Sequence, residues 1–286
     1  MQTTVGSEPK RIRALRESLV AQIPRVPNNR ATKAEIESKP LHQLLLIYLT
    51  WAARHVPARP REVALSTSLI TDSRWSTLQP QIEALLSDVT SGSDLSPYLS
   101  IRHSAKGYSK NSFKSSYETW EDKDQILQTM GYCHFHLTKR ELGRTDEVLF
   151  ARISRNRFEA LLISNHSVFK SSSNRTAALN AEASRLWKFF TEDRLQQHAP
   201  GQLVFLTNIA VTGHSIEHIE LAQKYTRMIQ EMDSKLDDPL VVQLLFGVQN
   251  LNEAKTIRPK WAFNFLDLGL INETTAIFHP YQLGPI

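Results

Sequence analysis

Three short apolar runs between residues 132 and 164 constrain the fold of this chain most strongly. They read YCHFHL, EVLFARI and RFEALLIS, and each is rich in aromatic and branched residues. SRN at 154–156 joins the last two runs and is short enough for a tight turn. Runs of this composition separated by tight turns are typical of antiparallel strands. The sequence therefore predicts a three-stranded antiparallel meander in the middle of the chain.

The flanking sequence has mostly helical patterns. Before the meander, apolar residues at helical spacing predict helices that end before Pro24, over about 41–55, over about 74–89, and just before Gly131. A brief strand is expected within RPREVALS. After the meander we expect helices within 175–198, from Ser215 to about 232 and over 240–248, and one strand at 203–211. The run PKWAFNFLDLGLI is apolar enough to pack against a core. The predicted fold class is α+β, with a small antiparallel β-meander flanked by N- and C-terminal helices.

These patterns divide the chain into three expected regions. Residues 1–100 form an N-terminal helical region, and residues 101–172 hold the antiparallel sheet with a basic flap. Residues 173–286 form a C-terminal helical region with one added strand, packed on the same core. The flap is the stretch from Arg102 to Lys114, which contains basic residues but no acidic residues and has aromatic residues interleaved. It is either a solvated loop or a segment that faces phosphates.

Charge and cysteine content limit the class of protein. The net charge of +5 is compatible with an anionic partner such as nucleic acid, although it does not require one. Cys133 is the only cysteine, which excludes an intrachain disulfide and fits a reducing, cytoplasmic setting. The apolar run at 41–53 is too short for a membrane span, and the charged start lacks the apolar core of a secretory signal. We therefore expect a cytoplasmic protein with no membrane partner.

Three histidines and an aspartate should meet at one edge of the meander. His134 and His136 alternate with core residues on the first strand, so both point to the same face. Asp146 precedes the second strand and His166 follows the third. The end of strand one, the start of strand two and the end of strand three lie at the same edge of a meander. The sequence therefore predicts that these four residues are neighbours.

Each of the four has an ordinary structural interpretation, as a half-exposed histidine, a turn cap or an anchored histidine. Together they fit two kinds of chemistry. Two histidines and a carboxylate can hold a divalent metal that activates water. Alternatively, histidine and aspartate beside arginine can cleave RNA without a metal, because one group removes the 2′-hydroxyl proton and another protonates the leaving oxygen. Histidine suits both transfers because its pKa lies near neutrality.

Basic residues surround this edge in the sequence and favour an anionic substrate over a simple metal hydrolase. They are Lys139, Arg140, Arg144, Arg152, Arg155 and Arg157. Cations of this kind can stabilise the charge of a phosphorane. We expect substrate contacts from Arg140, Arg144, Arg152, Lys106 and Lys110. We expect no metal ligand and no cofactor.

The run from CHFHL through RTDEVLFARI to LLISNHSVF resembles the C-terminal half of the RelE/ParE superfamily of toxins, most closely the YafQ-like branch. In that branch a histidine-bearing strand is followed by an aspartate that opens a strand with an aromatic-aliphatic run. A later strand closes with a histidine, two further residues and a phenylalanine. The matching positions here are His134 or His136, Asp146, 148–150, His166 and Phe169. The resemblance covers only residues from about 131 to 170, and Ser167 and Val168 stand where the branch has a pair that includes an acid.

This resemblance implies a metal-independent endoribonuclease of toxin type, in a toxin–antitoxin or phage-defence module. Its catalytic residues would be drawn from His134, His136, Asp146 and His166, its substrate would be RNA, and its partners would include the ribosome and an antitoxin protein. Two alternatives stay open. The sheet could serve as a non-catalytic module that binds nucleic acid or protein, or the same four residues could form a metal-dependent hydrolase. A third possibility is self-inhibition, in which a flank covers the basic edge as an antitoxin would, and deletion of the first 40 residues would then raise toxicity.

Overall fold

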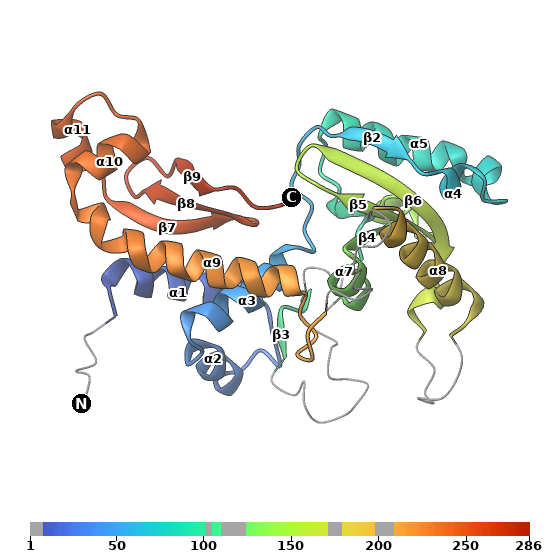
Figure 1. Ribbon diagram of the computed structural model, residues 1–286, viewed down its shortest axis with the longest axis horizontal. Helices are drawn as coiled ribbons and strands as arrows, with labels where there is room; N and C mark the ends of the chain where they lie inside the picture. Colours follow the sequence, from blue (N-terminus) through green and yellow to red (C-terminus); the bar gives the residue numbers. More distant parts are fainter. Residues whose placement is uncertain (1–7, 101–104, 110–123, 171–178, 198–208) are drawn as a thin grey trace. The chain divides into compact units, whose positions relative to one another are not determined.

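The predicted meander is present in the computed structural model, which describes residues 8–100, 105–109, 124–170, 179–197 and 209–286 (Figure 1). Strand β4 (Tyr132–His136) pairs antiparallel with β5 (Glu147–Ile153), which pairs antiparallel with β6 (Arg157–Asn165). A further strand, β2 (Glu62–Leu65), pairs parallel with β6 and lies within the segment expected to hold a brief strand. The resulting sheet has the order β2-β6-β5-β4, which leaves β4 at one edge among the described residues.

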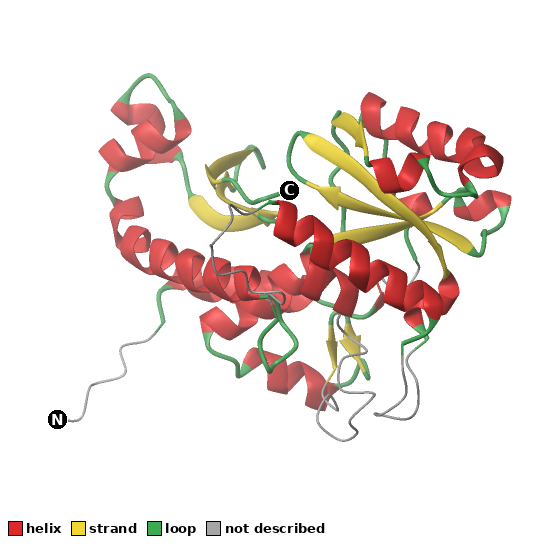
Figure 2. Ribbon diagram, turned by 45° about the vertical axis from the view of Figure 1, so that its right-hand side comes forward, coloured by secondary structure: helices red, strands yellow, loops and turns green. Residues whose placement is uncertain are grey.

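The two faces of this sheet carry different apolar residues, as strand alternation predicts. Cys133 and Phe135 on β4, and Leu137 just after it, join a core that includes residues of α5 (Trp75–Ser91). Tyr132 and the residues that alternate with it lie on the other face, where the core includes residues of α8 (Ala181–Gln196). Figure 2 shows helices on both sides of the sheet. His134 and His136 therefore share the α8 face with Tyr132.

Short elements connect these strands and carry most of the candidate site. Helix α7 (Gln125–Met130) precedes β4 and ends at Gly131, whose φ of 73° is the left-handed conformation common after helices. A 3₁₀ turn, η2 (Arg140–Leu142), lies between β4 and β5. Another, η3 (His166–Phe169), follows β6 directly. The remaining short elements of this part of the chain are α4 (Thr67–Ile70) and η1 (Ser96–Tyr98).

The described residues group into two compact units that are each built from segments distant in the sequence. The sheet unit consists of residues 54–100, 124–170, 179–197 and 209–213. The second unit consists of residues 8–53, 105–109 and 214–285. The bounds of these units differ from those of the three regions expected along the sequence, 1–100, 101–172 and 173–286. Lys106 belongs to the second unit and not, as expected, to the sheet region.

The second unit is helical with a separate antiparallel sheet. Its strands β7 (Pro259–Asn264), β8 (Asp267–Asn272) and β9 (Phe278–Gln282) form a meander in that order. The sequence indicated only an apolar segment here, so the sheet itself was not predicted. Its helices and short strands are α1 (Lys10–Gln22), β1 (Arg25–Val26), α2 (Arg30–Glu37), α3 (Leu41–Ala52), β3 (Tyr108–Ser109), α9 (Ile216–Asp233), η4 (Ser234–Asp237), α10 (Pro239–Phe246) and α11 (Leu251–Thr256). Helix α1 buries Ile12, Leu15 and Leu19, which makes it a core element rather than a loosely attached flank.

The α+β class is confirmed, and the predicted helices correspond to α1, α3, α5, α7, α8, α9 and α10. Ser215 caps α9 as expected, because its side chain accepts a hydrogen bond from the backbone N–H of His218. The expected strand at 203–211 lies mainly outside the described residues, as does most of the basic flap, including Lys110. Within the described part of the chain, no helix has the length and apolar character needed to span a membrane.

Candidate active site

His166 and Asp146 lie together at the end of the sheet where β5 begins and β6 ends. The pairing of Glu147 with Asn165 continues one residue further, so the backbone N–H of His166 donates to the carbonyl of Asp146 at 3.1 Å. The ring Nδ1 of His166 lies 2.7 Å from the same carbonyl and 3.4 Å from the Asp146 carboxylate. The Nδ1 atom therefore has an acceptor, and Nε2 is the nitrogen left for other chemistry. The His166 side chain is 39% exposed, so that nitrogen can reach a ligand.

The 3₁₀ turn that carries His166 is fixed by its neighbours. The Asn165 side chain accepts from the backbone N–H of Ser167 at 3.0 Å and so caps the turn. Asn180, the cap of α8, donates its side-chain amide to the carbonyl of Ser167 at 2.7 Å. Because α8 packs on the sheet, this contact ties the His166 turn to the core. The imidazole is therefore presented from a supported backbone.

His136 is buried beside His166. Only 2% of its surface is exposed, and its ring centroid lies 5.0 Å from that of His166. Burial, followed by the nearby Arg144 guanidinium and His166, lowers the pKa of His136 to about 4, and a backbone hydrogen bond with Thr145 opposes this shift. Its Nε2 faces Nη1 of Arg144 at 3.5 Å, a long contact in which the guanidinium is the donor. His136 is therefore a neutral acceptor for Arg144 at neutral pH.

His134 lies on the same face but in different surroundings. Its ring packs against Phe169 at 4.7 Å and Phe150 at 6.1 Å between centroids, and its side chain is 18% exposed. Its Nδ1 lies 3.5 Å from a carboxylate oxygen of Asp124, at the start of α7. Burial lowers the pKa of His134, Asp124 opposes that shift, and His166 adds to it. The rings of His134 and His166 both pack against Phe169, at 4.7 and 5.8 Å between centroids, so His134 lies on the same side of the sheet end as His166.

Asp124 was not among the residues singled out from the sequence. Its position just before QILQTM marks it as a helix cap, and its side chain accepts from the backbone N–H of Leu127 at 3.0 Å. What the pattern does not reveal is that the N-terminus of α7 folds back beside β4. Only the three-dimensional structure brings this carboxylate to a histidine ten positions away.

The predicted cations separate into two groups. Arg140 and Arg144 lie in the connection between β4 and β5 and both are exposed, and Nη1 of Arg144 lies 3.5 Å from Nε2 of His136. Arg152 was expected to contact the substrate. It pairs with Tyr132 and lies two residues along β5 from Phe150, which pairs with His134, and six residues from Asp146. There it forms ion pairs with Glu159 at 2.8 Å and with Asp193 on α8.

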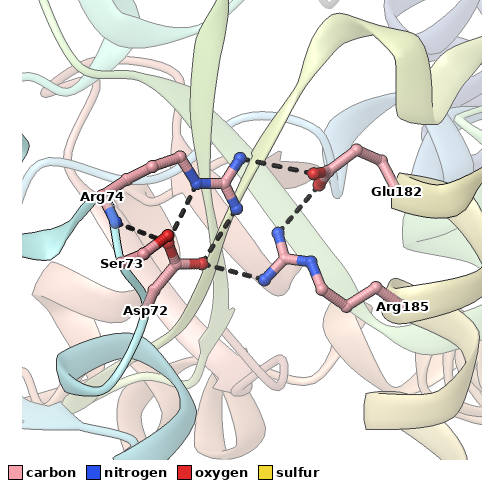
Figure 3. A pocket seen from close by; sticks show the side chains of 5 residues that line it. All are labelled: Asp72, Ser73, Arg74, Glu182 and Arg185. Carbon is pink, nitrogen blue, oxygen red and sulfur yellow. Dashed lines mark hydrogen bonds and ion pairs between the residues drawn. The ribbon is translucent and has the colours of Figure 1, made fainter.

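A second cluster of charged residues lines an open pocket of about 420 Å³ on the sheet unit (Figure 3). Arg74 pairs with Asp72 at 2.8 Å, and Arg185 pairs with Asp72 at 2.9 Å and with Glu182 at 2.8 Å. Hydrogen bonding to Arg74 lowers the pKa of Asp72 to about 2. Arg74 also donates to the backbone carbonyl of Ile163 on β6 at 2.9 Å. The charges of this cluster are paired with each other, and the cluster connects α8 to the end of β6.

The arrangement of donors bears on metal binding. In the described residues, no three or more histidine, cysteine or carboxylate side chains are grouped so that they could hold a metal ion. The ring nitrogens described above face the Asp124 carboxylate, the Arg144 guanidinium and the Asp146 carbonyl. A guanidinium directed at one of the imidazoles would repel a cation from that nitrogen.

Comparison with protein-family models, with curated proteins and with solved structures found no match for this chain. The functional interpretation therefore depends on the geometry of the histidine edge and on the resemblance described from the sequence.

Proposed function

We propose that this protein is an endoribonuclease that cleaves RNA by metal-independent acid–base catalysis, as the resemblance to RelE/ParE toxins implies. The observation that carries the proposal is the grouping of His166, His134 and Arg144 at one supported edge of the sheet. Two imidazoles and a guanidinium are the groups needed to move two protons and to stabilise a phosphorane.

His166 is the general acid in this proposal. Its Nδ1 lies 2.7 Å from the carbonyl of Asp146 and 3.4 Å from the Asp146 carboxylate, and these contacts fix the orientation of the ring. Nε2 then donates its proton to the 5′-oxygen as the bond between phosphorus and that oxygen breaks. A histidine in this role must be fixed in orientation and open to substrate, and His166 meets both requirements.

His134 is the general base. Of the two histidines on β4, it is the one without an arginine directed at its ring, and part of its side chain is exposed. Burial lowers the pKa of its ring and so favours the neutral form, which accepts the 2′-hydroxyl proton. The 2′-oxygen attacks phosphorus, and the products carry a 2′,3′-cyclic phosphate and a 5′-hydroxyl. His136 supports the site by accepting from Arg144.

Arg144 and Arg140 bind the phosphate. Both are exposed in the connection that reaches the histidine edge, and a bidentate guanidinium suits a phosphate with developing charge. Among the described residues, no carboxylate forms an ion pair with Arg144, so its charge is available to an anionic ligand.

The test is RNA cleavage by the purified chain in the presence of EDTA, with and without ribosomes. We expect cleavage by the wild type and a loss of roughly 10²–10⁴-fold in His166→Ala, which is the usual contribution of a general acid. His42→Ala is the matched control, because His42 is an exposed histidine of the second unit. Loss of wild-type cleavage on chelation would favour the metal-dependent alternative.

Expression in cells separates the ribonuclease from a binding module. An active toxin-type ribonuclease arrests growth, and His166→Ala relieves that arrest. A non-catalytic module that binds nucleic acid or protein is tolerated equally in both forms. Equal tolerance of wild type and variant, together with the absence of RNA cleavage, would contradict the proposal. An antitoxin protein, if the chain belongs to a toxin–antitoxin or phage-defence module, would suppress the arrest on co-expression.

A further inference from the structure

We infer that Asp124 is a positioning residue that holds His134 in the tautomer with the proton on Nδ1. The inference rests on the proposed function for its catalytic consequence, although the contact itself is independent of that function. Asp124 would act through His134 and would not touch the substrate. No sequence pattern assigns this role, since Asp124 lies outside the strands and turns that suggested the site.

The Asp124 carboxylate is the acceptor that lies near Nδ1 of His134. Nδ1 of His134 is buried and has no hydrogen bond within the described part of the chain, and the Oδ2 atom of Asp124 lies 3.5 Å from it. A buried polar atom without a partner is costly, and a shift of a few tenths of an ångström would turn this contact into a hydrogen bond. Catalytic hydrogen bonds are often long before substrate binds and shorten in the complex.

The two oxygens of Asp124 have separate tasks. Oδ1 accepts from the backbone N–H of Leu127 and caps α7, while Oδ2 is directed at His134. A helix cap needs only one acceptor, and asparagine caps as well as aspartate does. The second oxygen is therefore not explained by the cap, and the two tasks can be separated by substitution.

The tautomer decides whether His134 can act as a base. A neutral imidazole carries its proton on one nitrogen and accepts on the other. With the proton on Nδ1 facing Asp124, the lone pair on Nε2 is available to the 2′-hydroxyl. His166 has the same arrangement at Asp146, where a carbonyl lies 2.7 Å from Nδ1. His134 and His166 would then both present Nε2 to the substrate, and the Nδ1 of each would face an oxygen acceptor.

Asp124→Asn tests this assignment. The amide oxygen keeps the cap on Leu127, and the amide NH₂ then faces Nδ1 of His134, which favours the tautomer with the proton on Nε2. We expect an unchanged melting temperature, a shift of the His134 ring ¹⁵N resonances from the Nδ1–H to the Nε2–H pattern, and a loss of RNA cleavage of roughly 10²–10⁴-fold, as when a catalytic histidine is held in the wrong tautomer.

Two further variants keep the test decisive. Asp124→Ser retains a cap but lacks the second oxygen, so we expect the same loss of cleavage even where the asparagine variant folds poorly. Asp238→Asn is the matched control, because Asp238 caps α10 in the second unit by accepting from Leu240 at 2.9 Å. We expect this control to retain both cleavage and the His134 resonances of the wild type.

The outcomes separate this inference from the nuclease itself. Cleavage by wild type together with equal cleavage and unchanged ring resonances in Asp124→Asn would overturn the positioning role and leave the nuclease standing. A changed tautomer in a protein whose wild type does not cleave RNA would support the contact and remove the nuclease.

Discussion

The two ends of strand β5 carry arginines that look alike in the sequence but have opposite surroundings. Arg152 pairs with Glu159 and with Asp193 and lies 5.5 Å from the ring of Tyr132. Arg144, near the other end, is directed at the neutral ring of His136 and, within the described residues, has no ion pair with a carboxylate. Charge alone therefore does not mark a site. A cation is available to a ligand when the fold leaves it without a counter-ion.

The two ends of β5 should differ most in how much a substitution lowers RNA cleavage. His166→Ala should lower RNA cleavage by roughly 10²–10⁴-fold, because the acid is lost while the sheet is intact. Tyr132→Phe at the Arg152 end removes a hydroxyl that donates to Asp193 at 2.9 Å and should leave cleavage unchanged. Cleavage rates of the two variants, with circular dichroism as a check of folding, test this contrast. Equal losses would mean that the histidine edge has no special role.

Acid should destabilise the histidine end specifically. The pKa of His136 is about 4 in the folded protein, below its value of about 6.5 in the unfolded chain. The unfolded state therefore binds more protons between these values, and the stabilisation present above about pH 6.5 is lost as the pH falls towards 4. The loss is roughly 2 kcal/mol at pH 5 and about 3 kcal/mol when complete.

Denaturant unfolding of wild type and His136→Gln at pH 7.5 and pH 5 measures this loss. The variant should lose less stability than the wild type between the two pH values. Burial also lowers the pKa of His218, in the second unit, to about 4. His218→Gln therefore serves as a control that measures how much of the acid sensitivity comes from the second unit. An identical pH response of wild type and His136→Gln would show that His136 is not a buried neutral histidine.

Substituting each arginine with glutamine should affect stability at Arg152 and cleavage at Arg144. Arg152→Gln leaves Asp193 and Glu159 without their partner and should lower the free energy of unfolding by about 1–2 kcal/mol, with little effect on cleavage. Arg144→Gln should leave stability almost unchanged and lower cleavage by roughly 10-fold or more through weaker phosphate binding. Urea unfolding and cleavage kinetics of both variants distinguish the roles. The reverse pattern would contradict the comparison.

The smallest effect is expected at the Asp146 side chain. Nδ1 of His166 is closer to the backbone carbonyl, at 2.7 Å, than to the carboxylate, which is 72% exposed. Asp146→Asn should therefore lower cleavage only by roughly 3–10-fold, since the backbone still holds the ring and an exposed ion pair contributes little. The loss should diminish at high salt, which screens the carboxylate. A loss as large as that of His166→Ala would assign the side chain a larger role.

Local patterns predicted the meander and the convergence of the four site residues. Alternation placed His134 and His136 opposite Phe135, and the order of the strands placed Asp146 beside His166. The partners of Arg152 could not be predicted in this way, because Asp193 lies on a helix that packs on the sheet from 41 positions away. The role of Asp124 depends likewise on how α7 folds back beside β4.

The second sheet was missed for a different physical reason. Strands β7 and β8 are joined by Phe265 and Leu266, and Phe265 has a φ of 53°. Tight hairpin turns with positive φ usually carry glycine or asparagine, which makes them visible in a sequence. Here the turn is made of two apolar residues, so PKWAFNFLDLGLI reads as one continuous apolar segment.

The end groups produced from RNA distinguish acid–base cleavage at the histidine edge from other nuclease chemistry. Mass spectrometry of the fragments released by the wild-type chain in EDTA should find 2′,3′-cyclic phosphate and 5′-hydroxyl termini, because His134 takes the 2′-hydroxyl proton and His166 protonates the 5′-oxygen. A strand with a 2′-deoxy sugar at the cleaved position should remain intact. Fragments with 5′-phosphate and 3′-hydroxyl ends, or cleavage of the 2′-deoxy strand, would contradict the assignment of the histidine edge as an acid–base site.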